Sequence, residues 1–196
     1  GERMRTWLEA TRQLDLSEPR LRILAQKLTQ RLQTVPGRAA AIHSYVRRMP
    51  FVPSPRPSRT RASKVLARGQ GDAYAKGVLF VALCRAADIP SRLVVAKVPD
   101  PGERTHSLHL IAQVEIGGSW VSTDAFIVDP LMFAAAKHVL RAEGADSGWG
   151  IVADAPGLWD GRSHCIQQFH AEDAVSLMGP YDDVDDVLAG RAKLPT

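Results

Sequence analysis

Cysteine is scarce in this chain. Its 196 residues include only Cys84 and Cys165, and neither lies in a Cys-x-x-Cys or similar cluster. A disulfide framework and a clustered zinc site are therefore excluded as the basis of the fold, and we expect no metal site. So few cysteines favour a reducing, cytoplasmic setting, and we expect Cys84 to be a buried structural residue.

Long apolar runs, internal repeats and low-complexity linkers are also missing. The longest apolar stretches, such as residues 77–83, fall far short of the roughly 20 residues that cross a bilayer, so no membrane association is expected. The N-terminus is charged and is not followed by the apolar segment of a secretory leader. With 45% hydrophobic and 23% charged residues, the chain is predicted to form a single globular domain over residues 1–196.

Positive and negative charges are unevenly distributed. Residues 1–70 hold 15 Lys/Arg against 4 Asp/Glu, whereas residues 71–196 hold 10 against 17. The arginine-rich run 47–61 could track the phosphates of a nucleic acid, or it could be a proline-stiffened loop whose arginines meet solvent or the acidic C-terminal half. Neither an aromatic stacking platform nor a nucleic-acid-binding motif accompanies its charge, so we favour the loop and expect no nucleic-acid partner.

The hydrophobic periodicity predicts an α+β fold. Residues 18–33 have apolar positions at spacings of three and four, with Ser17 as candidate N-cap, and a second helix begins near Pro36 and ends before Pro50. Gly117-Gly118 between two β-branched runs is the signature of a tight hairpin. The remaining expected elements are helices at 73–87, 131–142 and 184–189 and strands at 92–98, 109–116 and 119–123, while residues 144–170 resist assignment.

The segment 69–77, Gly-Gln-Gly-Asp-Ala-Tyr-Ala-Lys-Gly, carries the clearest functional signal. A Gly-x-Gly-Asp turn leads directly into an apolar helix that Ala73 opens. A thiol at such a position would have a lowered pKa because of the helix dipole and the free N–H groups, which can also stabilise an oxyanion. His109 could accept the proton and Asp124 could orient its ring, since the two-glycine hairpin brings the two strand ends together.

These three blocks together resemble the core of the transglutaminase-like superfamily over about residues 62–130. The matching residues are Gly69, Gly71, Asp72, Lys76, Leu79, Ala82, Leu83, Arg85, Ala86, Ile89, Pro90 and Arg92, followed by His109 with Trp120 and Asp124 at +11 and +15. The resemblance implies a papain-like core in which the helix bearing the nucleophile position packs on an antiparallel sheet, preceded by N-terminal helices. It also implies Cys-His-Asp chemistry on an amide bond of a peptide or protein substrate, with no cofactor. Gln70, Asp72, Tyr74 and Trp120 are then candidates for substrate binding or oxyanion stabilisation.

The chain departs from the family pattern at three positions. Ala73 stands where the family has its catalytic cysteine, Ile111 stands where a tryptophan often follows the histidine, and Gln113 replaces a frequent glutamate. The chain could be a cysteine enzyme, of bacterial type, made inactive by a Cys-to-Ala change, or a natural pseudoenzyme that binds peptides. An unrelated basic adaptor or nucleic-acid binder is the third reading. Oligomeric state, and the choice between hydrolysis, deamidation and acyl transfer, stay open.

The motif order divides the expected domain into N-terminal helices with the Pro/Arg-rich loop (1–61), a catalytic core (62–130) and a C-terminal extension (131–196). Two geometric expectations follow from the spacing. His109 and Asp124 should lie within hydrogen-bond distance, and the Ala73 Cβ should point at the His109 ring across a surface cleft. His106, three residues before His109, fits the spacing to Trp120 and Asp124 less well.

Overall fold

A computed structural model of the chain describes residues 5–124 and 130–193, apart from the side chains of residues 130 and 132. The first four residues, part of the charged N-terminus, lie outside this description. The helices are α2 (Pro19–Thr29), α3 (Val35–Arg48), α4 (Ala62–Arg68), α5 (Ala73–Ala86), α6 (Pro130–Glu143) and α7 (Val184–Ala189), with a 3-10 turn at Ala171–Asp173. The strands are β1 (Ser91–Pro99), β2 (His106–Ile116), β3 (Ser119–Thr123), β4 (Ser147–Gly148), β5 (Ile151–Val152) and β6 (Ser176–Tyr181). This is the expected α+β class.

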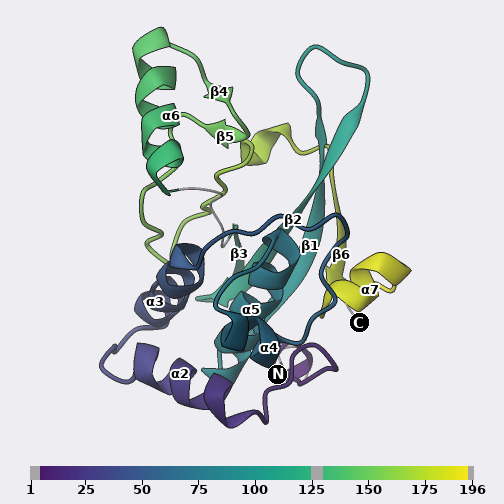
Figure 1. Cartoon of the computed structure of the whole chain (residues 1–196). Coiled ribbons are helices and arrows are strands. Elements are labelled where there is room, and N and C mark those ends of the chain that lie inside the picture. The colour runs from purple at the N-terminus through teal and green to yellow at the C-terminus, as the bar shows by residue number, and fades with distance from the viewer. Residues whose placement is uncertain (1–4, 125–129, 194–196) are drawn as a thin grey trace.

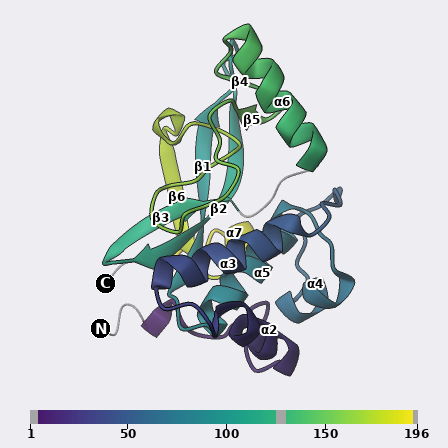
Figure 2. The ribbon, with the colours of Figure 1, turned by 90° about the vertical axis from the view of Figure 1, so that its left-hand side faces the viewer.

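An antiparallel sheet of order β3-β2-β1-β6 forms the centre of the fold, and α5 packs on one of its faces. Helices α2, α3 and α4 surround α5 on the side away from the sheet (Figures 1 and 2). Residues of α5 from Val78 to Cys84 are fully buried, because this helix has neighbours all round rather than on a single stripe. Helix α5, which Ala73 opens, is therefore the central buried element of the molecule.

Local sequence signals account for most element boundaries. Thr34 caps α3 by accepting the Gly37 N–H at 3.1 Å, with Pro36 in the first turn as expected. The predicted cap Ser17 is wrong: α2 begins at Pro19 after Glu18, whose side chain makes no capping bond, and it ends at Thr29 instead of residue 33. Proline at the first turn sets this start without a polar cap, because its missing N–H needs no acceptor.

The two-glycine hairpin forms as predicted, with Gly117 and Gly118 both at positive φ and Ile116 paired with Ser119. The sequence did not identify α4, β6 or the short β4–β5 pair. Strand β6 lies beside β1 although about 80 residues of chain separate them. A non-local pairing of this kind leaves little local signal.

The second face of the sheet is covered by the C-terminal part of the chain. Val94, Ala96 and Ile111 form an apolar cluster there with Phe169, and Ile166 and Ala174 pack against it. Helix α6 stands apart with β4 and β5 around a small cluster that contains Phe133 (Figure 1). None of the helices that the structure describes combines the length and apolar composition needed to cross a lipid bilayer.

Candidate active site

The N-terminus of α5 is held by Asp72. Its carboxylate accepts the Ala75 N–H at 2.7 Å and the Ser58 N–H at 3.3 Å, and the residue is only 7% exposed. Ala73 is the first helical residue, as predicted. Within the described residues, no acceptor takes the backbone N–H groups of Ala73 or Tyr74. These groups are therefore available to an incoming oxyanion.

Lys76 joins this first turn of α5 to the end of α3. Its ammonium group is fully buried and donates to the carbonyls of Arg47 and Met49 at 3.1 and 2.7 Å. Burial, helped by the nearby Arg47 cation, lowers the pKa of Lys76 to about 8. A cation is well placed here because the last carbonyls of α3 have no partner inside that helix. The family-matching lysine thus has a structural role that fixes the position of residue 73.

His109 and Asp124 are connected through a third residue, Gln168. The Gln168 side-chain oxygen lies 3.1 Å from His109 Nδ1, and its amide nitrogen donates to Asp124 Oδ2 at 3.2 Å. Asp124 Oδ2 also accepts the backbone N–H groups of Gln167 and Gln168 at 2.9 and 3.2 Å. The second oxygen, Oδ1, is buried and has no partner among the described residues. The expected direct hydrogen bond between His109 and Asp124 is therefore wrong.

The strand register explains why Gln168 lies between His109 and Asp124. Ala112 pairs with Thr123, so Asp124 follows opposite Ile111, and His109 lies two residues further along β2. The amide of Gln168 spans this diagonal. Because an ionised carboxylate can only accept, the amide nitrogen must face Asp124 and the amide oxygen must face His109. His109 then carries its proton on Nδ1, and Nε2, which no described residue binds, is left as a proton acceptor.

The relation between His109 and Ala73 also differs from the expectation. Gly77 packs α5 on the sheet beside Leu110 and Leu93, so Ala73, about 6 Å earlier along the helix, lies near the level of His109. However, neighbouring strand residues point to opposite faces. His109 shares the face of Ile111, and its ring lies 5.0 Å from that of Phe169. The Ala73 Cβ therefore does not meet the ring on the α5 face. Among the described residues, the last β3 partner of β2 is Thr123, which pairs with Ala112.

Asp124 is buried in a polar environment that includes α3. His43 Nε2 donates to the Asp124 carbonyl at 2.8 Å and lies 3.1 Å from Thr123 Oγ1, while no described residue partners its Nδ1. Burial lowers the pKa of His43 to about 4, so the ring is neutral near pH 7. Burial raises the pKa of Asp124 to about 6, opposed by its hydrogen bonds from Gln167 and Gln168. The carboxylate still ionises at neutral pH.

The expected substrate-binding residues separate into two regions. Gln70 and Asp72 line a cleft of about 420 Å³ beside the start of α5, and Tyr74 is half-buried against the core. Trp120 lies elsewhere: its ring stacks under the Arg92 guanidinium at 3.7 Å and lines a pocket of about 310 Å³ on the far face of the sheet. Ile111 and Gln113, the two departures from the family pattern, line the same pocket. These two departures therefore alter the wall of the pocket on the far face of the sheet, and not the cleft beside Ala73.

Sequence reasoning missed Gln168 and His43. Gln168 lies in the segment 144–170, which carries no periodicity, and only the fold brings it to His109. His43 lies on the apolar side of a correctly predicted helix, where a histidine among alanines and Ile42 was the available signal. Cys84 is buried as predicted, and Cys165 is buried too; burial raises the pKa of each thiol, that of Cys165 to about 11.

Comparison with solved structures gives matches to known folds. A candidate cysteine protease from Cytophaga hutchinsonii aligns with 24% identity and a TM-score of 0.55 over 66% of this chain and 44% of that protein. The periplasmic domain of TgpA from Pseudomonas aeruginosa aligns with 21% identity and a TM-score of 0.49 over 63% of this chain and 46% of the other. The chain thus spans less than half the length of these proteins. No curated protein matches it.

The family comparison covers more of the chain than the motifs did. Residues 22–125 match the transglutaminase-like superfamily, so the match reaches back through α2 and α3 to helices that the motif blocks left out. Helices α2 and α3 both pack around α5, so the matched region includes the helices that surround the start of the motif. This chain belongs to the transglutaminase-like superfamily.

Proposed function

We propose that the chain has the catalytic framework of a transglutaminase-like cysteine enzyme that acts on an amide bond of a peptide or protein, present here without its nucleophile. The observation that carries the proposal is the chain of hydrogen bonds from Asp124 through Gln168 to His109, which leaves His109 Nε2 as a proton acceptor. The capped start of α5 at residue 73, near the same level of the sheet, supplies the place for a thiol.

The reaction follows from these groups once residue 73 is a cysteine. His109 Nε2 takes the thiol proton, and the sulfur forms a bond to the amide carbon. The N–H groups of residues 73 and 74 stabilise the oxyanion of the tetrahedral intermediate. The carbon–nitrogen bond then breaks, and the departing amine takes the proton back from His109. Water, or a second amine, releases the acyl group from sulfur.

The two sides of this site have to meet around the edge of β2. His109 is on the far face of the strand and residue 73 is on the α5 side, and within the described residues β3 pairs with β2 only as far as Ala112. We propose that the scissile amide lies at this edge. In this proposal the partly buried His109 ring keeps its Nδ1 hydrogen bond to Gln168 and offers Nε2, which no described residue binds, to the reacting groups.

A second candidate function is a natural pseudoenzyme that binds peptides without cleaving them. Ala73 itself favours it, together with the cleft of about 420 Å³ that adjoins the start of α5. Such a module would use the cleft and would make no demand on His109.

Turnover in the Ala73→Cys protein tests the first candidate and separates its reactions. Glutaminyl peptides are incubated with and without a primary amine, and ammonia, amine incorporation and new N-termini are quantified by mass spectrometry. Ammonia alone indicates deamidation, amine incorporation indicates acyl transfer, and a new N-terminus indicates peptide hydrolysis. Ala73→Ser and the double variant Ala73→Cys/His109→Ala are the controls. Absence of all three products, together with peptide binding by the unaltered chain, would favour the pseudoenzyme.

A further inference from the structure

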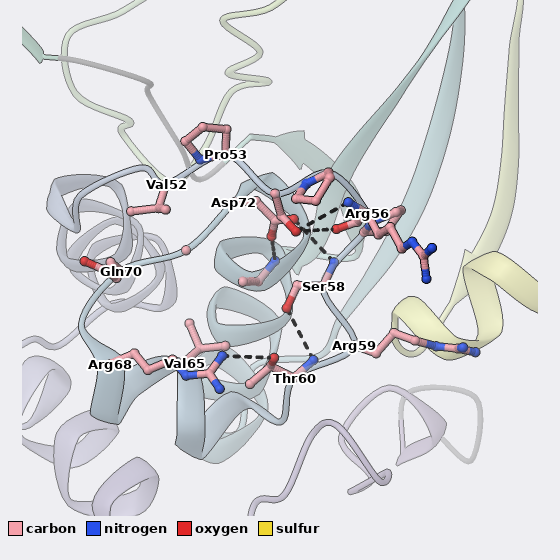
Figure 3. A pocket seen from close by; sticks show the side chains of 15 residues that line it. Val52, Pro53, Arg56, Ser58, Arg59, Thr60, Val65, Arg68, Gln70 and Asp72 are labelled. Carbon is pink, nitrogen blue, oxygen red and sulfur yellow. Dashed lines mark hydrogen bonds between the residues drawn. The ribbon is translucent and has the colours of Figure 1, made fainter.

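The cleft beside the start of α5 has a distinctive construction. It lies between the proline-rich segment 52–60, helix α4 and residues 70–72 (Figure 3). The proline-rich segment is tied to the residues that precede α5: the Val52 N–H donates to the Gly71 carbonyl at 3.0 Å, and the Ser58 N–H donates to Asp72. The wall of the cleft and the start of α5 are therefore one connected structure. A ligand in the cleft therefore lies against residues 70–72, which immediately precede residue 73 in the sequence.

Three arginines line this cleft, and their charges are unequally compensated. Arg59 extends toward α7, where Asp185 accepts its Nε–H at 2.8 Å (Figure 3). Arg68 reaches only the Thr60 hydroxyl at 3.4 Å. Within the described residues, the Arg56 guanidinium has no hydrogen-bond or ion-pair partner. Two exposed cations thus face the cleft without an opposite charge.

The cleft has one acidic residue of its own, and that residue is already used. Asp72 is buried, and both of its oxygens accept backbone N–H groups at the cap of α5. It therefore cannot turn outward to pair with Arg56 or Arg68 without uncapping the helix. The cleft has an unmatched positive charge that a ligand with carboxylates would match.

The remaining lining residues favour a peptide over a nucleic acid. None of the described residues that line the cleft is aromatic, so these residues offer no surface on which bases stack. Pro53, Pro55 and Pro57 give the wall a restricted backbone that loses little conformational freedom on binding. An extended peptide needs only such a wall and charge partners for its side chains.

We propose that this cleft selects acidic peptide segments, whose Asp or Glu carboxylates pair with Arg56 and Arg68. Under the proposed function, it sets the substrate class: amide bonds flanked by acidic residues are brought to position 73. The binding step itself needs neither a thiol nor His109. It can therefore be measured on the chain as it stands.

Fluorescence polarisation tests the selectivity. The unaltered chain is titrated against a labelled ten-residue peptide with four glutamates and against the same peptide with four lysines, at about 0.05 and 0.15 M salt. We expect the acidic peptide to bind at least about tenfold more tightly, with the difference shrinking at the higher salt because exposed charges are screened over about 8 Å there. Equal affinities for the two peptides would overturn the proposal.

Charge-neutralising variants locate the site. Arg56→Gln/Arg68→Gln should weaken acidic-peptide binding about tenfold, whereas Arg20→Gln/Arg22→Gln, which removes two exposed arginines from α2, should change it less than twofold. Equal losses in both variants would mean that net charge, and not the cleft, attracts the peptide. Stronger binding of a ten-nucleotide single strand that is lost in the first variant would assign the arginines to nucleic acid instead. If Ala73→Cys turns over peptides without acidic preference, the proposed function stands and this inference fails.

Discussion

Replacing Ala73 by cysteine should create a thiol far more reactive than the two native ones. A free cysteine has a pKa near 8.5, and a partly exposed helix N-terminus stabilises a thiolate by about 1 kcal/mol, which lowers the pKa to roughly 7.8 at about 1.4 kcal/mol per unit. Roughly a tenth of this thiol is then ionised at pH 7. The pKa of Cys165 is raised to about 11 by burial, so only about one part in 10⁴ of it is ionised.

The ratio of thiolate populations at positions 73 and 165 is therefore on the order of 10³ at pH 7. Cys84 should react more slowly still, because it is fully buried and its thiol pKa is raised further. Iodoacetamide labelling of the folded Ala73→Cys protein, with the labelled positions quantified by peptide mass spectrometry from pH 5 to 9, measures these rates directly.

Two histidine variants make the result specific to the proposed site. His109→Ala should slow labelling at position 73 and move its pH profile upward, because the proton acceptor is lost. His106→Ala, three residues earlier on the same strand and exposed, should leave both unchanged. Labelling at position 73 no faster than at Cys165, or indifferent to both variants, would refute the view that this end of the sheet activates a thiol.

Three further predictions follow from particular contacts. In the Ala73→Cys background, Gln168→Ala should slow labelling and shift its pH profile while leaving the urea midpoint nearly unchanged, since Gln168 joins His109 to Asp124; an unchanged profile would remove it from the mechanism. Arg85→Met should lower the free energy of unfolding by about 3 kcal/mol in urea titrations, because the buried Asp182 carboxylate loses its 2.9 Å partner and keeps the partly exposed Lys193 at 2.6 Å; the double variant Arg85→Met/Asp182→Leu should lose less, and an equal loss would argue against the ion pair. Between pH 4 and 6, the native state binds more protons at Asp124 (pKa about 6) than the unfolded chain does, so this group makes stability fall as pH rises. The native state binds fewer protons at His43 (pKa about 4) than the unfolded chain does, so this group makes stability rise with pH. The two slopes should nearly cancel in the unaltered chain, while Asp124→Asn should be stabilised and His43→Asn destabilised as pH rises through this window; parallel profiles for the two variants would contradict the assignment.

The sequence alone determined the elements whose signals are local. The cap and apolar run of α5, the proline at the start of α3 and the Gly117-Gly118 hairpin each depend on a few adjacent residues, so their positions agree with the structure. The order of motif blocks was enough to indicate the family, because the residues at 69–92, 109, 120 and 124 keep fixed spacings.

Only the tertiary structure decided how the site residues meet. Spacing sets the position of a residue along a strand, but the face on which its side chain points depends on the register with its neighbours, and a shift of one residue reverses it. His109 therefore turned toward Phe169, and Trp120 toward Arg92, instead of joining Ala73. Gln168 comes from a segment without periodicity, and its contact with a residue 59 positions earlier is a product of the packed fold. No local pattern encodes such a contact, because it exists only when the C-terminal segment lies against the sheet.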